Sequence, residues 1–145
     1  MIDSNVRDCI FRALFALIFV GLGFEHIFSD ELLQDLMPEW VPYPRVASFL
    51  CGVWLLGWGG LIMVGWRVRW AGVALGAFLI FATLTVHLPG VLVAPISVNA
   101  SCERLWSILQ RSNLAKNLCL LGVCVTLIDY KVGRYSLERY LGRAG

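Results

Sequence analysis

The two histidines of the chain, His26 and His87, are the residues whose type most clearly suggests chemistry. Each lies near the end of a long apolar segment, and Glu25 directly precedes His26. Lys116 and Asn117 lie near the start of another apolar segment. Ionisable groups at membrane depth are costly, so they indicate either function or pairing. Because the unperturbed pKa of histidine is about 6.5, such a group could relay protons or donate a hydrogen bond to a ligand.

Four apolar segments must position these groups. Hydrophobic residues make up 59% of the 145 residues and charged residues only 15%, whereas a soluble domain usually carries about 25% charged residues. A soluble chain of this length has too little core to bury so much apolar surface. A spanning helix needs about 20 mostly apolar residues. The sequence therefore predicts one all-α membrane domain over residues 1–145, a four-transmembrane-helix bundle with helices at about 10–28, 46–66, 70–88 and 114–130.

The basic residues near the predicted helix ends indicate the orientation. Lysine and arginine accumulate in cytoplasmic loops. Eight of the twelve fall on the side of the two termini, which predicts that the N- and C-termini are cytoplasmic and that the opposite side is the outer one. A net charge of +2 without a basic patch gives no indication of a nucleic-acid partner. The eight are Arg7, Arg12, Arg67, Arg69, Lys131, Arg134, Arg139 and Arg143, and the other four are Arg45, Arg104, Arg111 and Lys116.

The two outer loops each contain an amphipathic stretch. Residues 31–37 and residues 104–110 place apolar side chains on one helical face, which predicts two short interfacial helices. Pro89 and the glycine after it are expected to end the third spanning helix. Cys51 and Cys102 both fall on the outer side, so a disulfide between them is possible, and the sequence does not decide whether it forms.

A pair of small residues predicts how the third helix packs. Gly72 and Gly76 are four positions apart, so they lie on one face of a helix. Missing side chains at such a pair let a neighbouring backbone approach closely. We therefore expect Gly72 and Gly76 to serve helix packing.

Because a helix rises about 1.5 Å per residue, the ionisable and polar residues of the different helices should lie at a similar depth near the outer ends. They would form one polar layer there. A quinone could enter it from the lipid and accept hydrogen bonds from His26, His87 or Lys116, while Glu25 and a histidine relay protons. The two histidines could instead ligate haem iron. The usual spacing motifs of haem ligands are missing, so haem is less favoured than a quinone. The layer could also simply hold the bundle together and dock a partner protein. No metal-cluster motif appears, so no metal site is predicted, and no catalytic residue can be assigned.

Several short motifs resemble the DoxX family and its DoxX-like relatives. They are Gly21-Leu-Gly-Phe-Glu-His26-Ile-Phe28, Met37-Pro-Glu-Trp-Val-Pro42, Cys51-Gly52-Val53, Val86-His87-Leu88-Pro89 and Asn113-Leu-Ala-Lys116-Asn117-Leu-Cys-Leu-Leu-Gly122. The resemblance extends from about residue 12 to residue 130. It implies a four-helix bundle in the cytoplasmic (inner) membrane of a bacterium.

For some relatives the resemblance implies a membrane subunit or partner of a quinone-linked or oxidative-stress redox system. Four residues correspond by position: His26, His87, Lys116 and Asn117. Many relatives place a glutamate shortly after the glycine of the second helix, whereas Gly52 is followed by apolar residues. A relay that needs that carboxylate would have to use Glu25. The alternative is a non-enzymatic membrane scaffold or a small-solute carrier, and whether the protein is an enzyme stays open.

Overall fold

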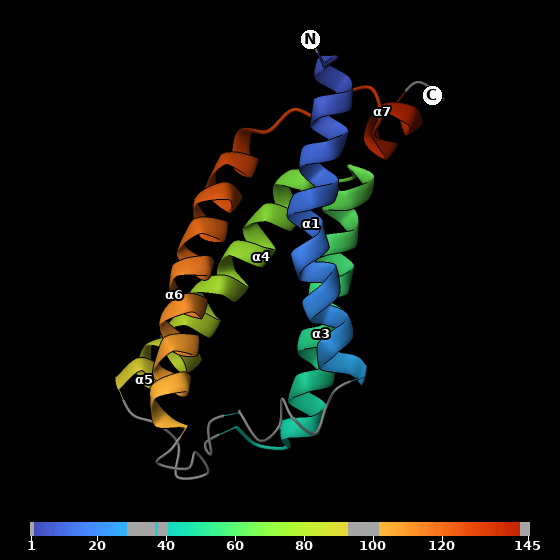
Figure 1. Ribbon diagram of the computed structural model, residues 1–145. Helices are drawn as coiled ribbons and strands as arrows, with labels where there is room; N and C mark the ends of the chain where they lie inside the picture. The colour runs from blue at the N-terminus through green and yellow to red at the C-terminus, as the bar shows by residue number, and fades with distance from the viewer. Residues whose placement is uncertain (1, 29–36, 38–40, 93–101, 143–145) are drawn as a thin grey trace.

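The computed structural model describes residues 2–28, 37, 41–92 and 102–142. Within these residues the fold is all-α, and four helical segments are long and apolar enough to cross a membrane (Figure 1). The predicted fold class is therefore confirmed. The four segments are Ser4–Phe28, Pro44–Val64, Val68–Leu92 and Glu103–Asp129. The first and last described residues lie together at one end, here called the terminal end, and the opposite end is the loop end.

The first helix, α1, spans Ser4–Phe28 and begins about two turns before the predicted start. The helix begins earlier because Asp3 caps its N-terminus, ahead of the apolar residues. The Asp3 carboxylate accepts a hydrogen bond of 3.0 Å from the backbone N–H of Asn5. An acidic cap at this position satisfies one of the amide groups that have no partner inside the helix. The helix therefore extends through polar residues that a hydropathy window excludes.

The second spanning helix, α3, covers Pro44–Val64 and ends in a tight turn. Gly65 adopts the left-handed conformation with φ of 72°, which glycine enters without steric cost. The N–H groups of Gly65 and Trp66 donate to the carbonyls of Ile62 and Leu61. These bonds satisfy the last carbonyls of α3. The turn leads directly into α4, Val68–Ala82.

The third span does not end at Pro89 as expected. After α4 it widens into a π-helical turn, η1 at Thr83–His87, and continues as α5, Leu88–Leu92. The N–H of Leu88 donates to the carbonyl of Thr83, five residues earlier. Proline has no N–H, and its ring crowds the carbonyl four residues before it. The π turn absorbs that irregularity ahead of Pro89, so the helix continues.

The fourth span also differs from the expected range, because α6 covers Glu103–Thr126 and therefore begins well before residue 114. Residues 104–110, expected to form a separate interfacial helix, are its first turns. The Trp106 indole N–H donates to the carbonyl of Gly90 at 2.9 Å, which attaches this stretch to the third span. A short 3-10 turn, η2 at Leu127–Asp129, follows α6, and α7, Leu137–Leu141, lies at the terminal end. The other expected interfacial helix, residues 31–37, lies outside the described residues except for Met37.

The spans associate as two pairs. α1 packs mainly against α3 and α6 packs against α4, and the contact between α3 and α4 joins the pairs. In Figure 1 the two pairs diverge toward the loop end. One apolar core runs through both pairs and includes Phe15, Phe19, Leu55, Ile62, Leu75, Leu79 and Leu127.

Glycines allow close approach within each pair. A Cβ on Gly52 would lie 2.8 Å from the carbonyl oxygen of Gly23, where α3 meets α1. A Cβ on Gly72 would lie 2.8 Å from the Cβ of Leu127, and one on Gly76 would lie 3.4 Å from the Cβ of Cys124. At the two shorter distances, those of Gly52 and Gly72, a larger residue would not fit without movement of the neighbour, whereas the 3.4 Å at Gly76 is an ordinary contact distance.

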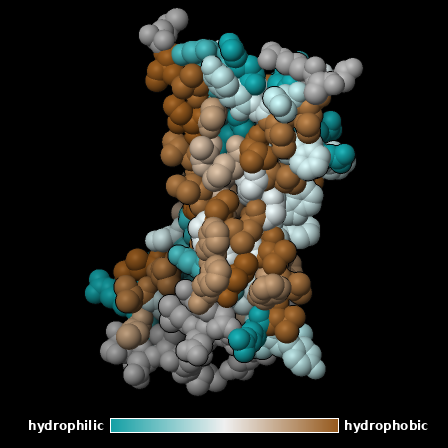
Figure 2. Space-filling view, turned by 90° about the vertical axis from the view of Figure 1, so that its right-hand side faces the viewer, coloured by the Kyte–Doolittle hydropathy of each residue, from teal (hydrophilic) through white to brown (hydrophobic). Residues whose placement is uncertain are grey.

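The outer surface of the helices is apolar. Figure 2 shows hydrophobic side chains along the helices, with many hydrophilic side chains at the terminal end and others toward the loop end. Large apolar side chains are exposed on all four spans, among them Leu14, Leu17, Phe49, Leu50, Trp54, Phe81, Leu118 and Val125. Soluble monomers rarely expose contiguous apolar surface of this extent. The protein is therefore a multi-pass membrane protein whose spans contact lipid.

Candidate functional site

His26 is held between α1 and α3 by Ser48. Its Nδ1 lies 3.1 Å from the Ser48 hydroxyl oxygen, and that hydroxyl donates to the backbone carbonyl of His26 at 3.0 Å. Because the hydroxyl has one proton and donates it to the carbonyl, Nδ1 must carry the proton of the neutral ring. The other ring nitrogen, Nε2, then has a lone pair that can accept a proton. Ser48 is fully buried and also caps a carbonyl in the last turn of α1.

His87 is held in the same way on the other helix pair. It ends the π turn, and its Nδ1 lies 2.9 Å from the side-chain oxygen of Gln110 on α6. An amide oxygen only accepts hydrogen bonds, so Nδ1 donates and Nε2 again keeps its lone pair. Gly90 leaves the space for Gln110, because a Cβ there would lie 2.9 Å from the Gln110 Cδ. Gln110 is almost fully buried, which fixes the ring that it holds.

The remaining two predicted residues lie on α6. The Asn117 amide donates to the Thr83 hydroxyl at 3.2 Å and so binds the start of the π turn. Lys116 donates to the Asn113 side chain at 3.0 Å. Asn117 is buried and Lys116 is half-buried. Because α6 begins at Glu103, Lys116 lies about 20 Å along the helix from its start, deeper than the first turns where the sequence placed it.

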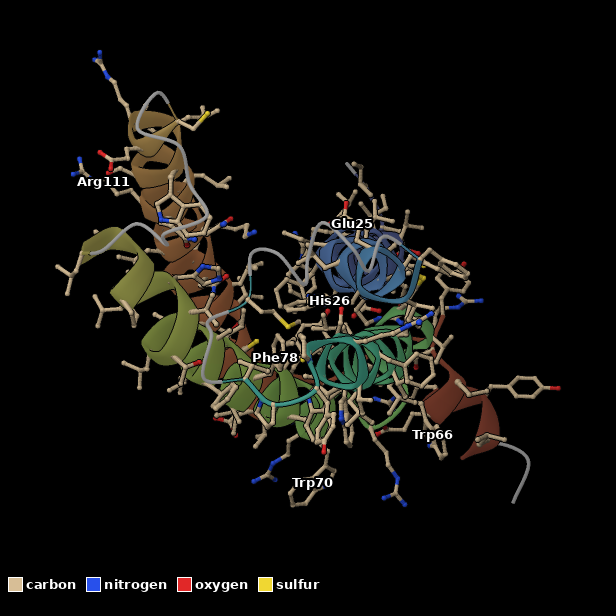
Figure 3. All side chains as sticks on the ribbon, turned by 90° about the horizontal axis from the view of Figure 1, so that it is seen from below. Glu25, His26, Trp66, Trp70, Phe78 and Arg111 are labelled. Atoms are coloured by element: carbon tan, nitrogen blue, oxygen red, sulfur yellow. The ribbon has the colours of Figure 1, made fainter. Side chains whose placement is uncertain are left out.

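Charge couples the two helix pairs. The exposed Glu25 on α1 interacts electrostatically with Lys116 on α6, and Lys116 interacts with His87. In Figure 3, viewed from the loop end, His26 lies on the side of α1 that faces α3, whereas Glu25 lies on another side of the helix. Both histidines are among the described residues, and no hydrogen bond joins them. The two histidines are thus anchored on separate helix pairs, and the electrostatic interactions of Lys116 with Glu25 and with His87 connect the pairs.

Three partners in this layer were missed at the level of sequence: Ser48, Gln110 and Thr83. Each is a neutral polar residue next to or within an apolar segment, and such residues are common in membrane helices. A depth comparison of the third and fourth spans could have paired Thr83 with Asn117. The pairing of Gln110 with His87 was missed because the fourth helix was expected to begin only at about residue 114, after Gln110. Cys51 carries a free thiol, so the disulfide to Cys102 is not formed.

A second polar cluster lies at the terminal end and was not predicted. The Arg12 side chain is fully buried on α1 and pairs with the Asp8 carboxylate, with 3.1 Å between Nε and Oδ2. Its Nη atoms donate to the carbonyls of Met63 at 2.8 Å and Tyr135 at 2.6 Å. In the sequence, Arg12 stands out only as one of the basic residues that indicate the orientation of the helices. The available signal was the spacing of Asp8 and Arg12, which places both on one helical face.

Tyr130 completes this cluster. Its hydroxyl donates to the other oxygen of the Asp8 carboxylate. Burial, followed by that hydrogen bond and the negative charge of Asp8, raises the pKa of Tyr130 above its usual value. The cluster therefore joins α1, the end of α3 and the segment after α6 through fully partnered groups. Among the described residues, no group of three histidine, cysteine, aspartate or glutamate side chains could hold a metal ion.

Comparison with known proteins identifies the family. The DoxX family model matches residues 8–88, which is more than half of the chain and includes both histidines. Neither the search of curated proteins nor that of solved structures gave a match. The match ends before α6, so the positional correspondence of Lys116 and Asn117 stays a prediction. The resemblance seen in the sequence is confirmed over the first three spans, and the chain belongs to the DoxX family.

Proposed function

We propose that this DoxX membrane protein is the membrane subunit or partner of a quinone-linked or oxidative-stress redox system, and that its polar layer binds the quinone. The observation that supports this most is the state of the two histidines. Each ring is anchored through Nδ1, by Ser48 or by Gln110. Each therefore keeps Nε2 for a ligand, in the fixed tautomer that proton transfer requires.

The layer contains the complementary groups that a quinone and its reduced form need. A quinone carbonyl accepts hydrogen bonds, and the Lys116 ammonium can donate one while it remains bonded to Asn113. A quinol hydroxyl donates, and Nε2 of His26 or His87 can accept its proton. Oxidation of a quinol to a quinone releases two protons and two electrons. In this proposal the histidines take the protons and a partner protein takes the electrons.

Glu25 provides an exit for the protons. Its carboxylate is exposed and lies in the last turn of α1, at the loop end. It is electrostatically coupled to Lys116, which in turn is coupled to His87. Many family relatives carry a glutamate on the second helix. That glutamate has no counterpart here, because the apolar residues Val53 and Trp54 follow Gly52. In this proposal Glu25 takes that role.

We also propose that the protein lies in the cytoplasmic membrane of a bacterium with its terminal end in the cytoplasm. The support is the distribution of basic residues. Arg7, Arg67, Arg69, Lys131 and Arg134 are exposed around the terminal end. Basic residues near helix ends favour the cytoplasmic side. The polar layer then opens on the outer half of the bilayer.

The first test is the identity of the molecule that copurifies. The protein is purified from bacterial membranes in mild detergent, its absorption spectrum is recorded with and without dithionite, and a solvent extract is analysed by mass spectrometry. We expect quinone at about one per protein and no Soret band. A Soret band would replace this proposal by haem ligation through the histidines. Neither signal, together with no saturable quinone binding, would favour the scaffold or small-solute carrier.

The second test assigns the binding to the layer. His87→Ala removes the anchored ring, whereas Arg111→Ala changes an exposed residue of α6 that points away from the α1–α3 pair in Figure 3. We expect His87→Ala to remain folded and to lose bound quinone, while Arg111→Ala keeps it. Equal quinone content in the two variants would contradict the assignment.

A further inference from the structure

A groove lies at the terminal end, far from the polar layer. Its volume is about 530 Å³, within the range of small-molecule sites, about 300–1,000 Å³. One wall is the start of α1 and the other is the segment just after η2. We call it the terminal groove; its lining residues are Ser4, Asn5, Arg7, Asp8, Phe11, Tyr130, Lys131 and Gly133.

The charges of the terminal groove favour an anion. Arg7 and Lys131 are both exposed and stand on its two walls. The one carboxylate in the lining, Asp8, is already engaged by Arg12 through one oxygen and by the Tyr130 hydroxyl through the other. Because the buried Arg12 compensates the charge of Asp8, the two exposed cations dominate the field in the groove.

The floor of the terminal groove is aromatic. The rings of Phe11 and Tyr130 are in contact, with 5.6 Å between their centroids. The groove also lies at the level where two spans end, because the α1 span begins at Ser4 and the α6 span ends at Asp129. Anionic headgroups lie at this level of a bilayer, beside apolar chains. An anion with an attached apolar chain therefore matches both the rim and the floor.

We propose that the terminal groove binds one anionic phospholipid, with its headgroup phosphate between Arg7 and Lys131. The Asp8–Arg12 pair and Tyr130 hold the two walls together, so the site is formed before the lipid arrives. This site is independent of the quinone proposal, because it lies at the opposite end of the molecule and shares no residue with the polar layer.

The test measures lipid binding to purified, delipidated protein by native mass spectrometry. Phosphatidylglycerol and phosphatidylcholine with identical chains are titrated separately. The double variant Arg7→Gln/Lys131→Gln removes both cations, and Arg104→Gln/Arg111→Gln makes the same charge change on exposed residues at the loop end. Both variants are first compared with the wild type in helix content and thermal unfolding, which exposed substitutions should leave unchanged.

We expect the wild type to bind phosphatidylglycerol more tightly than phosphatidylcholine. Loss of two juxtamembrane cations should weaken phosphatidylglycerol binding by about 25-fold. The loop-end variant should stay within about twofold of the wild type, because its charges lie beyond a screening length. Equal affinity for the two lipids, or equal loss in both variants, would overturn the proposal. Glycerol phosphate that competes as strongly as the whole lipid would overturn it as well, since the groove would then bind a soluble phosphate.

Discussion

Replacing Arg12 by methionine should destabilise the protein strongly, through the loss of the cluster at the terminal end. The guanidinium is fully buried and donates to Asp8, to the carbonyls of Met63 and Tyr135, and to that of Ile62 at 3.4 Å. Methionine fills much of the same volume but donates nothing, so Asp8 loses its cation and the carbonyls lose their donor.

The expected cost follows from the state of Asp8. Removing one partner of a buried ion pair costs about 3–5 kcal/mol. The Asp8 side chain stays about 10% exposed and keeps the Tyr130 hydroxyl, so the lower part of that range applies. Arg12→Met should therefore lower the free energy of unfolding by about 3 kcal/mol. In the double variant Arg12→Met/Asp8→Asn no uncompensated charge remains, so we expect about 1–2 kcal/mol of that loss to return.

The assay is equilibrium unfolding in mixed micelles with increasing denaturing detergent, followed by tryptophan fluorescence and helix content. The wild type, both single variants and the double variant form one cycle. If Arg12→Met unfolded within about 0.5 kcal/mol of the wild type, as an ordinary surface substitution does, the cluster would not hold the terminal end together. An additive double variant would show that Arg12 and Asp8 act independently.

Three further predictions concern other parts of the fold. Gly72→Ala places a Cβ 2.8 Å from the Cβ of Leu127 in η2, so in the same detergent assay it should lower the free energy of unfolding by about 1–3 kcal/mol. Gly57→Ala meets open space and should leave that free energy unchanged. Tyr130 has a raised pKa in the folded state, so its contribution to stability is present below its unfolded pKa of about 10 and falls as pH rises above it. Between about pH 9 and pH 11 the free energy of unfolding should therefore fall more for the wild type than for Tyr130→Phe. Equal falls would show that the raised pKa of Tyr130 does not contribute to stability. Gly90→Ala displaces the flexible Gln110 side chain, so it should keep the fold but weaken quinone binding; unchanged binding would show that the anchor of His87 is not needed.

The four spans could be predicted because each apolar window carries its own signal. The window around Gly72, for example, is apolar throughout and needs no distant partner to be recognised. The start of α6 could not be predicted in this way, because residues 103–113 are too polar to be included in an apolar window. Their place in the helix depends on contacts with the third span, such as Trp106 with the carbonyl of Gly90.

The candidate site was predicted in part for the same reason. His26 and His87 stand out because ionisable groups are rare in apolar segments. Their anchors do not stand out, because a serine or glutamine in a membrane helix is ordinary. The π turn that positions His87 results from a proline and a buried asparagine contact, which no periodicity reveals. The cluster of Arg12 requires the fold itself, since it joins the first helix to the segment that follows the last span.

The most direct measurement is photolabelling with a light-activated quinone analogue, followed by mass spectrometric mapping of the labelled residues. We predict that the label falls around His26, Thr83–His87 and Lys116, that excess unlabelled quinone removes it, and that His87→Ala reduces it. A label that is not displaced by quinone, or that falls only at the terminal end, would contradict the claim that the polar layer is the quinone site.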